Sequence, residues 1–164
     1  MSLDVDERLQ RALDLACTYV NRRERTVAEV RAQLERKGIP DQPAEQAVQT
    51  LVEQRLLDDE RFAELFVADK RELEQWGAER IRRGLLARGI DRELAERAMV
   101  AADGDGGDPG PTSELDRAVE LLRRRFPTPP GERRERDRAL GVLLRKGYEP
   151  ELALDALNAY AHGE

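Results

Sequence analysis

The stretch that decides the fold is residues 81–99, I-R-R-G-L-L-A-R-G-I-D-R-E-L-A-E-R-A-M, because the chain carries this pattern three times. The other copies are residues 30–48, V-R-A-Q-L-E-R-K-G-I-P-D-Q-P-A-E-Q-A-V, and residues 139–157, A-L-G-V-L-L-R-K-G-Y-E-P-E-L-A-L-D-A-L. One glycine holds the same place in each copy, and these glycines are Gly38, Gly89 and Gly147. Three copies of one pattern along a single chain indicate that the chain is built from tandem units.

The pattern around each glycine is typical of two helices joined by a tight turn. A leucine lies four residues before it, and the basic residue directly before it suits the negative end of a helix dipole. The glycine can adopt the left-handed conformation that closes a helix. An apolar residue follows, and two alanines further on let a second helix pack closely. The shared residues are Leu34, Leu85 and Leu143; Lys37, Arg88 and Lys146; Ile39, Ile90 and Tyr148; Ala44, Ala95 and Ala153; Ala47, Ala98 and Ala156. We predict that the three glycines are structural turn residues.

Composition places the chain among all-helical proteins. Of its 164 residues, 38% are charged and only 4% are aromatic, and Ala, Leu, Glu and Arg are abundant. No run approaches the ~18 apolar residues of a membrane span, and the first residues lack the apolar core of a secretory signal. The single cysteine, Cys17, cannot form an internal disulfide. We therefore expect a cytoplasmic protein.

Helix-start signals divide the chain into three helical units. We predict unit one at residues 1–57, unit two at 58–102, an acidic Gly/Pro linker at 103–112, and unit three at 113–164. A first helix is expected at about residues 5–22, and helices are also expected at 133–146 and 151–161. The predicted caps are the pair Thr26 and Glu29, the residue Asp58, and the pair Ser113 and Asp116.

The second unit also carries the large apolar residues of the chain's middle. We predict that Phe62, Leu65 and Phe66 share the inner face of its first helix, and that the helix runs until Trp76 and Gly77 break it. Trp76 is expected to anchor the core or to lie at a contact surface. Gly77 occupies the place in unit two that Thr26 holds in unit one.

The sequence shows no constellation for catalysis or for a cofactor. The lone histidine, His162, lies in the tail and cannot build a triad, and no phosphate-binding or dinucleotide loop is present. The acidic run at 58–60 lacks a metal-binding partner motif. Asp103, Asp105 and Glu114 match three places of a calcium loop, but Asp108 stands where that loop requires glycine. We predict that the protein is no enzyme and has no catalytic residue, metal or cofactor.

Charge is unevenly spread along the chain. The total is 28 basic against 34 acidic side chains, a net charge of −6, which argues against simple non-specific DNA binding. Residues 113–146 instead hold ten basic and six acidic side chains. A basic segment in an acidic protein is the expected place for contacts with a polyanion.

Two further blocks point to a family. L-D-D-E-R-F-A at residues 57–63 and W-G-A-E-R-I-R-R-G-L-L-A-R-G-I at residues 76–90, with the threefold L-x-x-[KR]-G-[IY], resemble the RecX family of bacterial recombination regulators. The resemblance covers about residues 8–160. One departure is Arg55-Leu56-Leu57, where the family usually has Gly-Tyr-Leu or Gly-Leu-Ile before the aspartates.

The resemblance implies a fold and a function. The fold would be three tandem three-helix repeats, stacked into an elongated, curved, solenoid-like array. The protein would be a non-enzymatic monomer that binds the filament of the RecA recombinase along its groove. It would limit the ATP hydrolysis, extension and strand exchange of that filament, and would meet single-stranded DNA mostly through RecA.

Clustered arginines are the candidate contacts with the filament, because a RecA–DNA filament is polyanionic. The candidates are Arg80, Arg82, Arg83, Arg88, Arg123, Arg124 and Arg125. Glutamates placed at 82 and 83 together, or at 124 and 125 together, are expected to weaken filament binding without lowering the melting temperature.

Two other classes of protein stay open. The sequence G-[IY]-x4-A-x-x-A also looks like a ubiquitin-associated module, which binds proteins but lacks the block at residues 57–63. The arginines could alternatively serve an autonomous nucleic-acid-binding module, against which stand the net charge and the lack of stacking aromatics in the arginine clusters.

Overall fold

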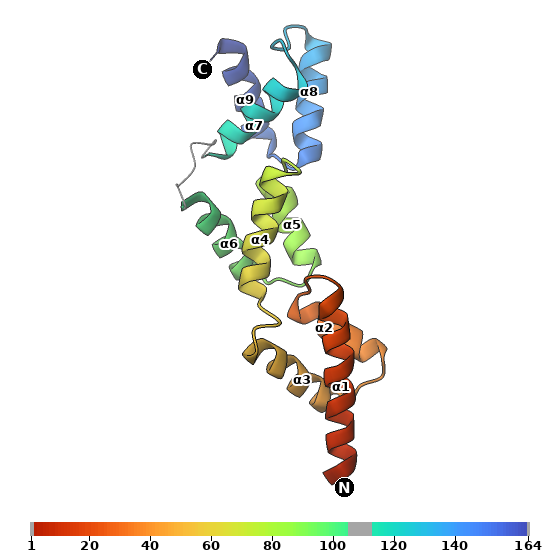
Figure 1. Cartoon of the computed structure of the whole chain (residues 1–164). Helices are drawn as coiled ribbons and strands as arrows, with labels where there is room; N and C mark the ends of the chain where they lie inside the picture. The colour runs from red at the N-terminus through yellow and green to blue at the C-terminus, as the bar shows by residue number, and fades with distance from the viewer. Residues whose placement is uncertain (1, 105–112, 164) are drawn as a thin grey trace. The chain divides into compact units, whose positions relative to one another are not determined.

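The computed structural model describes residues 2–104 and 113–163, and all regular structure in these two ranges is α-helical (Figure 1). The helices of these ranges are α1 (Ser2–Arg22), α2 (Val27–Arg36), α3 (Asp41–Glu53), α4 (Asp59–Glu72), α5 (Ala78–Ala87), α6 (Arg92–Gly104), α7 (Glu114–Arg125), α8 (Arg133–Lys146) and α9 (Pro150–His162). They form three repeats of three helices: α1–α3, α4–α6 and α7–α9. The prediction of an all-helical protein with tandem three-helix repeats is confirmed.

The predicted helix starts are confirmed. The hydroxyl of Thr26 accepts a hydrogen bond from the backbone N–H of Glu29, whose carboxylate accepts one from the N–H of Thr26, so both members of a capping box are present. Ser113 and Asp116 form the same box at α7. Asp58 accepts a hydrogen bond from the N–H of Arg61 at the start of α4. These side chains bind N–H groups that the first helical turn leaves without partners.

The three turn glycines adopt the predicted left-handed backbone, with φ of +75° at Gly38, +83° at Gly89 and +97° at Gly147. The residue after each glycine donates its N–H to the carbonyl of the leucine four residues before the glycine, as in Ile90 to Leu85 at 3.0 Å. This bond closes the helix, and it turns the following apolar side chain back into the core. Ile39, Ile90 and Tyr148 are accordingly buried.

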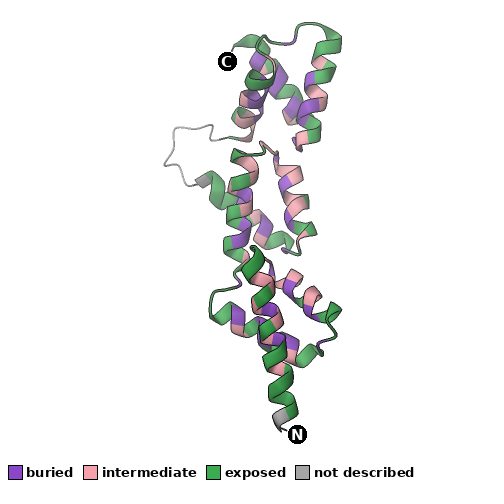
Figure 2. Cartoon of the chain, turned by 45° about the vertical axis from the view of Figure 1, so that its right-hand side comes forward, coloured by how far each residue is buried: buried purple, intermediate pink, exposed green. Residues whose placement is uncertain are grey.

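Packing divides the chain into two compact units. The N-terminal unit comprises residues 1–63 and 85–94, and the C-terminal unit comprises residues 64–84 and 95–164. The core of the N-terminal unit includes Ala12, Leu34 and Leu51, and one core of the C-terminal unit includes Leu122 and Leu143. Within each unit the buried residues lie on the sides of helices that face other helices (Figure 2). All six paired alanines are buried, as the close approach of the second helix requires.

One expectation for α4 is wrong. The side chain of Leu65 is 45% exposed, whereas Ala63 and Val67 are fully buried beside Phe62. Each residue turns an α-helix by ~100°, so Leu65 lies ~200° from Ala63 and points away from the core. The helix also ends at Glu72, before the predicted break at Trp76, and α1 begins at Ser2 instead of about residue 5.

The predicted linker lies mostly outside the described residues, which omit 105–112. Its first two residues, Asp103 and Gly104, belong to the end of α6. The carboxylate of Asp103 pairs with Arg71 at 2.8 Å and with Arg117 at 3.6 Å. Since two guanidinium groups hold this carboxylate, the one described aspartate of the calcium-like pattern already has partners within the C-terminal unit.

Candidate functional site

The repeats meet in contacts that we call joints. In each joint, the start of the second helix of one repeat packs on the turn glycine of the next repeat. The first joint lies inside the N-terminal unit. In this joint the hydroxyl of Thr26 donates a hydrogen bond to the carbonyl of Arg88 at 2.6 Å. The N–H of Val27 donates to the carboxylate of Asp59 at 2.9 Å.

The first joint also contains an ion pair, between Arg88 and Glu29. The guanidinium of Arg88 binds both carboxylate oxygens of Glu29, at 3.0 and 2.9 Å, and lies 4.8 Å from the ring centre of Phe62. Burial disfavours ionisation of Glu29, but hydrogen bonds from Arg88 and from the N–H of Thr26 outweigh it and lower the pKa of Glu29. The charge of Arg88 is therefore matched within this unit.

The second joint lies inside the C-terminal unit and repeats this geometry with different residues. The N–H of Gly77 donates to the carbonyl of Lys146 at 2.8 Å. The N–H of Ala78 donates to the carboxylate of Glu114 at 2.8 Å. A β-carbon on Gly77 would lie 2.6 Å from the backbone of Gly147, so glycine is needed here for the two backbones to meet.

Charge distinguishes the two joints. In the first joint the ion pair joins Glu29, which precedes its own turn glycine by nine residues, to Arg88, which directly precedes the next turn glycine. At the second joint the corresponding residues are Arg80 and Lys146. Arginine thus replaces the acidic member, and the second joint brings together two cations where the first joint has an ion pair.

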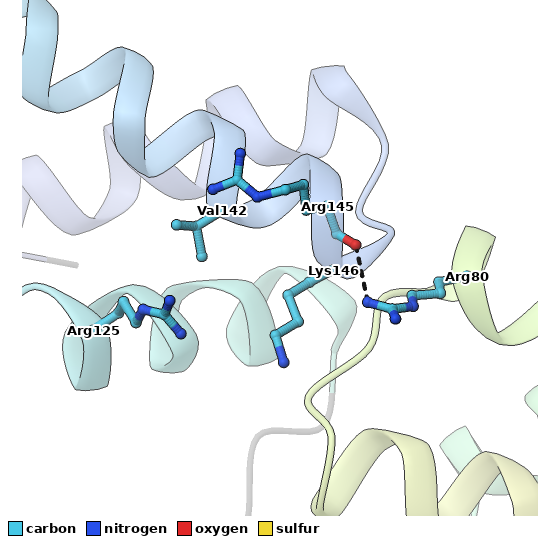
Figure 3. A pocket seen from close by; sticks show the side chains of 5 residues that line it. All are labelled: Arg80, Arg125, Val142, Arg145 and Lys146. Carbon is cyan, nitrogen blue, oxygen red and sulfur yellow. Dashed lines mark hydrogen bonds between the residues drawn. The ribbon is translucent and has the colours of Figure 1, made fainter.

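These two cations line a hollow in the C-terminal unit (Figure 3). The hollow is bounded by Arg80 at the start of α5, Arg125 at the end of α7, and Val142, Arg145 and Lys146 on the last turns of α8. Four of its five lining residues are therefore cations, and no lining residue is acidic. Such a lining favours an anion.

Neutral partners hold two of these cations in place. The guanidinium of Arg80 lies 4.1 Å from the ring centre of Trp76 and donates to the carbonyl of Arg145 at 3.1 Å. The ammonium of Lys146 donates to the carbonyl of Glu74 at 2.8 Å. Carbonyls and aromatic faces orient a cation, yet they carry no net charge. These contacts therefore orient Arg80 and Lys146 without supplying a negative charge to either.

The other two cations approach from α7 and α8. The guanidinium of Arg145 folds back along its own helix, and its Nη1 would lie 3.1 Å from a β-carbon on Gly141. Arg125 is exposed in the last turn of α7, where a cation suits the helix dipole. No carboxylate in the described ranges forms a salt bridge with either side chain.

The structure distributes the predicted arginines among different environments. Arg82 binds Glu96 and also Glu79 at 2.6 Å, and Arg124 binds Glu120 at 3.1 Å. The exposed side chains of Arg83 and Arg123 have no carboxylate partner among residues 2–104 and 113–163. Arg80 and Arg125 line the hollow, and Arg88 closes the first joint.

Sequence reasoning missed two of the four cations that line the hollow. The repeat pattern marks Lys146 only as the basic residue before a turn glycine, and it does not single out Arg145. A signal was nevertheless present, because aligning the repeats on their glycines places Arg80 opposite Glu29. That alignment marks the second joint as the one whose basic residue lacks an acidic counterpart.

Two other kinds of site are absent from the described residues. In residues 2–104 and 113–163, no group of three or more His, Cys, Asp and Glu side chains is placed to hold a metal ion. None of the helices in those ranges is long and apolar enough to cross a membrane.

The three repeats define the chain as a tandem helical-repeat protein. Family models for the first, second and third three-helix domains of RecX match residues 12–51, 58–99 and 112–157. A protein named Regulatory protein RecX, from Trichlorobacter lovleyi, is 32% identical over 133 residues, covering 79% of this chain and 82% of that protein. Another of that name, from Mycolicibacterium vanbaalenii, is 31% identical over 161 residues, covering 93% and 84%. The chain belongs to the RecX family of regulatory proteins.

A solved structure shows the same fold. The crystal structure of RecX from Lactobacillus salivarius matches with a TM-score of 0.77, over 94% of this chain and 97% of that one, at 21% identity. Membership of the RecX family, shown by the family models and the curated relatives, favours a regulatory role over the two alternative classes, a ubiquitin-associated-like module and an autonomous nucleic-acid-binding module. The curvature of the array stays a prediction.

Proposed function

We propose that the chain binds the filament that the RecA recombinase forms on single-stranded DNA. By this binding it lowers the ATP hydrolysis, extension and strand exchange of the filament. Membership of the RecX family of regulatory proteins supports this proposal, together with what the sequence resemblance implies. The protein acts in the cytoplasm as a monomer and without catalysis of its own, and it meets single-stranded DNA mostly through RecA.

The observation that carries the proposal is a set of unpaired cations on an acidic chain. Net charge is −6, so the molecule as a whole is repelled by a polyanionic filament. Exposed Arg83 and Arg123 have no carboxylate partners in the described ranges, and residues 113–146 carry an excess of four positive charges. Cations of this kind can steer an acidic protein so that its basic side meets the filament.

The test is RecA's DNA-dependent ATP hydrolysis, measured while the chain is added up to a wide molar excess. We expect hydrolysis to fall at equimolar or lower amounts of the chain. The variant Arg83→Glu with Arg123→Glu should need more protein for the same effect. Its control is Arg22→Glu with Arg23→Glu, which changes net charge equally at two exposed positions of the N-terminal unit.

The possible results separate clearly. Unchanged hydrolysis across the excess would refute the regulatory proposal. If both double variants weaken inhibition equally, net charge matters and the named arginines do not. If only the first variant weakens it, Arg83 and Arg123 belong to the filament contact.

A further inference from the structure

We propose that the basic hollow of the second joint binds a phosphate group, supplied by the backbone of a nucleic acid. The hollow consists of Arg80, Arg125, Val142, Arg145 and Lys146. The proposal depends on the geometry of the second joint alone. It goes beyond regulation of RecA, because the chain should bind this phosphate in the absence of any recombinase.

The first argument is the comparison between joints. At the first joint, Glu29 neutralises Arg88 through two hydrogen bonds. At the second joint, the basic residue before the turn, Lys146, is retained, but its counterpart is Arg80. The fold itself does not require a cation here, since the first joint is built with an acid at the same place. An arginine at this position creates an unmatched charge, which an external anion can match.

The second argument is that the cations are positioned before a ligand arrives. Arg80 is held between the ring of Trp76 and the carbonyl of Arg145, and Lys146 is held by the carbonyl of Glu74. Ordering a long side chain in advance removes part of the entropy cost of binding. Each guanidinium keeps further N–H donors beyond these contacts, because arginine has five.

The third argument concerns the ligand's chemistry. Three guanidinium-bearing residues and one ammonium-bearing residue from three helices line the hollow, with no acidic lining residue, and such donors suit the several oxygens of a phosphate. Figure 3 shows the side chains of Arg80, Arg125 and Lys146 reaching the hollow from different elements. Phosphodiesters recur along a nucleic-acid strand, and cations of this kind bind them without reading sequence.

Trp76 provides a direct readout. It is the only tryptophan of the chain, and its ring lies under the guanidinium of Arg80. Titration of the full chain with oligothymidylate, without RecA, should change the emission of Trp76 in a saturable way. Titrations with inorganic phosphate, with ADP and with polyglutamate at equal ionic strength then distinguish the sources of the anion.

Charge reversal locates the contact. Arg80→Glu recreates the acid–base arrangement of the first joint, so the variant should fold normally and bind a labelled oligothymidylate more weakly. The slope of log affinity against log salt should fall by roughly 0.7 to 1 for each phosphate that the variant no longer binds. Arg80→Lys should keep most of the binding. The control Arg133→Glu, an exposed residue of α8 outside the hollow, should keep the parental slope.

Each outcome bears on the proposal. Parental affinity and slope in Arg80→Glu and in Arg125→Glu would overturn it, provided that circular dichroism shows both variants folded. Tighter binding of polyglutamate than of oligothymidylate would overturn it in favour of a protein surface. Competition by inorganic phosphate or ADP at low concentration would overturn the assignment to a nucleic-acid backbone. Binding of the oligonucleotide that depends on Arg80 but not on Arg133 would support it.

Discussion

Glu29 and Arg80 occupy the same position in successive repeats and carry opposite charges. Each lies nine residues before the turn glycine of its repeat, Gly38 or Gly89, on the second helix. Glu29 pairs with Arg88, whereas Arg80 lies beside Lys146 in a hollow without acidic residues. The same structural position therefore holds an ion-paired glutamate, Glu29, in the first joint, and in the second an arginine, Arg80, that has no acidic partner in the described ranges.

The turn glycines should differ in how well they tolerate alanine. Gly38 has a left-handed backbone but open space around its α-carbon, so Gly38→Ala should cost about 1 kcal/mol of unfolding free energy. At Gly89 a β-carbon would also lie 2.3 Å from the β-carbon of Ala28. Overpacking adds to the strain, and Gly89→Ala should cost about 2–4 kcal/mol. Urea denaturation measures both, and equal losses of stability would contradict the role of Gly89 in the first joint.

Neighbouring leucines of α5 offer a test of the core. Leu85 is fully buried, and Leu85→Ala should lower the free energy of unfolding by about 2–4 kcal/mol. Leu86 is 37% exposed, so Leu86→Ala removes the same atoms from a partly solvated site and should cost less. If thermal or urea unfolding gives the two variants the same stability, the assignment of the inner face of α5 is wrong.

Acid should weaken the first joint through Glu29. The pKa of Glu29 is lower in the folded chain than its ordinary value of 4.5, so the unfolded chain binds more protons in this range. The stability that Glu29 contributes is fully present above pH ~4.5 and is lost as pH falls through the lower folded pKa. Glu29→Gln should be less stable than the parent at pH 7, and the difference should shrink below pH ~4.5.

Comparing the parent with Glu29→Gln also cancels the contribution of a second carboxyl group, Asp59, to the pH dependence of stability. Burial raises the pKa of Asp59, and its hydrogen bond from Val27 only partly offsets this rise. Its effect on stability has the opposite sign to that of Glu29, but parent and variant both retain Asp59. A difference in stability that stays constant from pH 7 to pH 3 would show that Glu29 is not the titrating group.

Arg82 and Arg83 should behave differently, although they are adjacent. Arg82 binds Glu79 and Glu96, so Arg82→Glu would bring three carboxylates together and should lower the melting temperature. The expectation of an unchanged melting temperature for glutamates at 82 and 83 is revised for this reason. Exposed Arg83 lacks a carboxylate partner in the described ranges, so Arg83→Glu should melt like the parent. Calorimetry measures the melting temperatures of Arg82→Glu and Arg83→Glu, and equal values would mean that the Arg82 ion pairs contribute no stability.

The sequence by itself determined the repeat and its turns. Spacing on either side of Gly89 predicted a buried Leu85 and a buried Ile90, and both predictions are confirmed. Such features follow from local rules, because a left-handed glycine and a helical period depend on nearby residues. The capping box at Thr26 was predictable for the same reason. Leu65 was predicted wrongly, since several apolar residues in α4 allow more than one stripe and packing selects between them.

Only the tertiary structure decided which arginines are paired and which are unmatched. Arg88 meets Glu29 from 59 residues away, and Arg80 meets the carbonyl of Arg145 from 65 residues away. Local periodicity carries no information on contacts at such separations. Ion pairing depends on which side chains the packed helices bring within a few ångströms, because Coulomb attraction at an exposed surface fades within about a Debye length. Seven arginines looked alike in the sequence, and the packing of the helices gave them different partners.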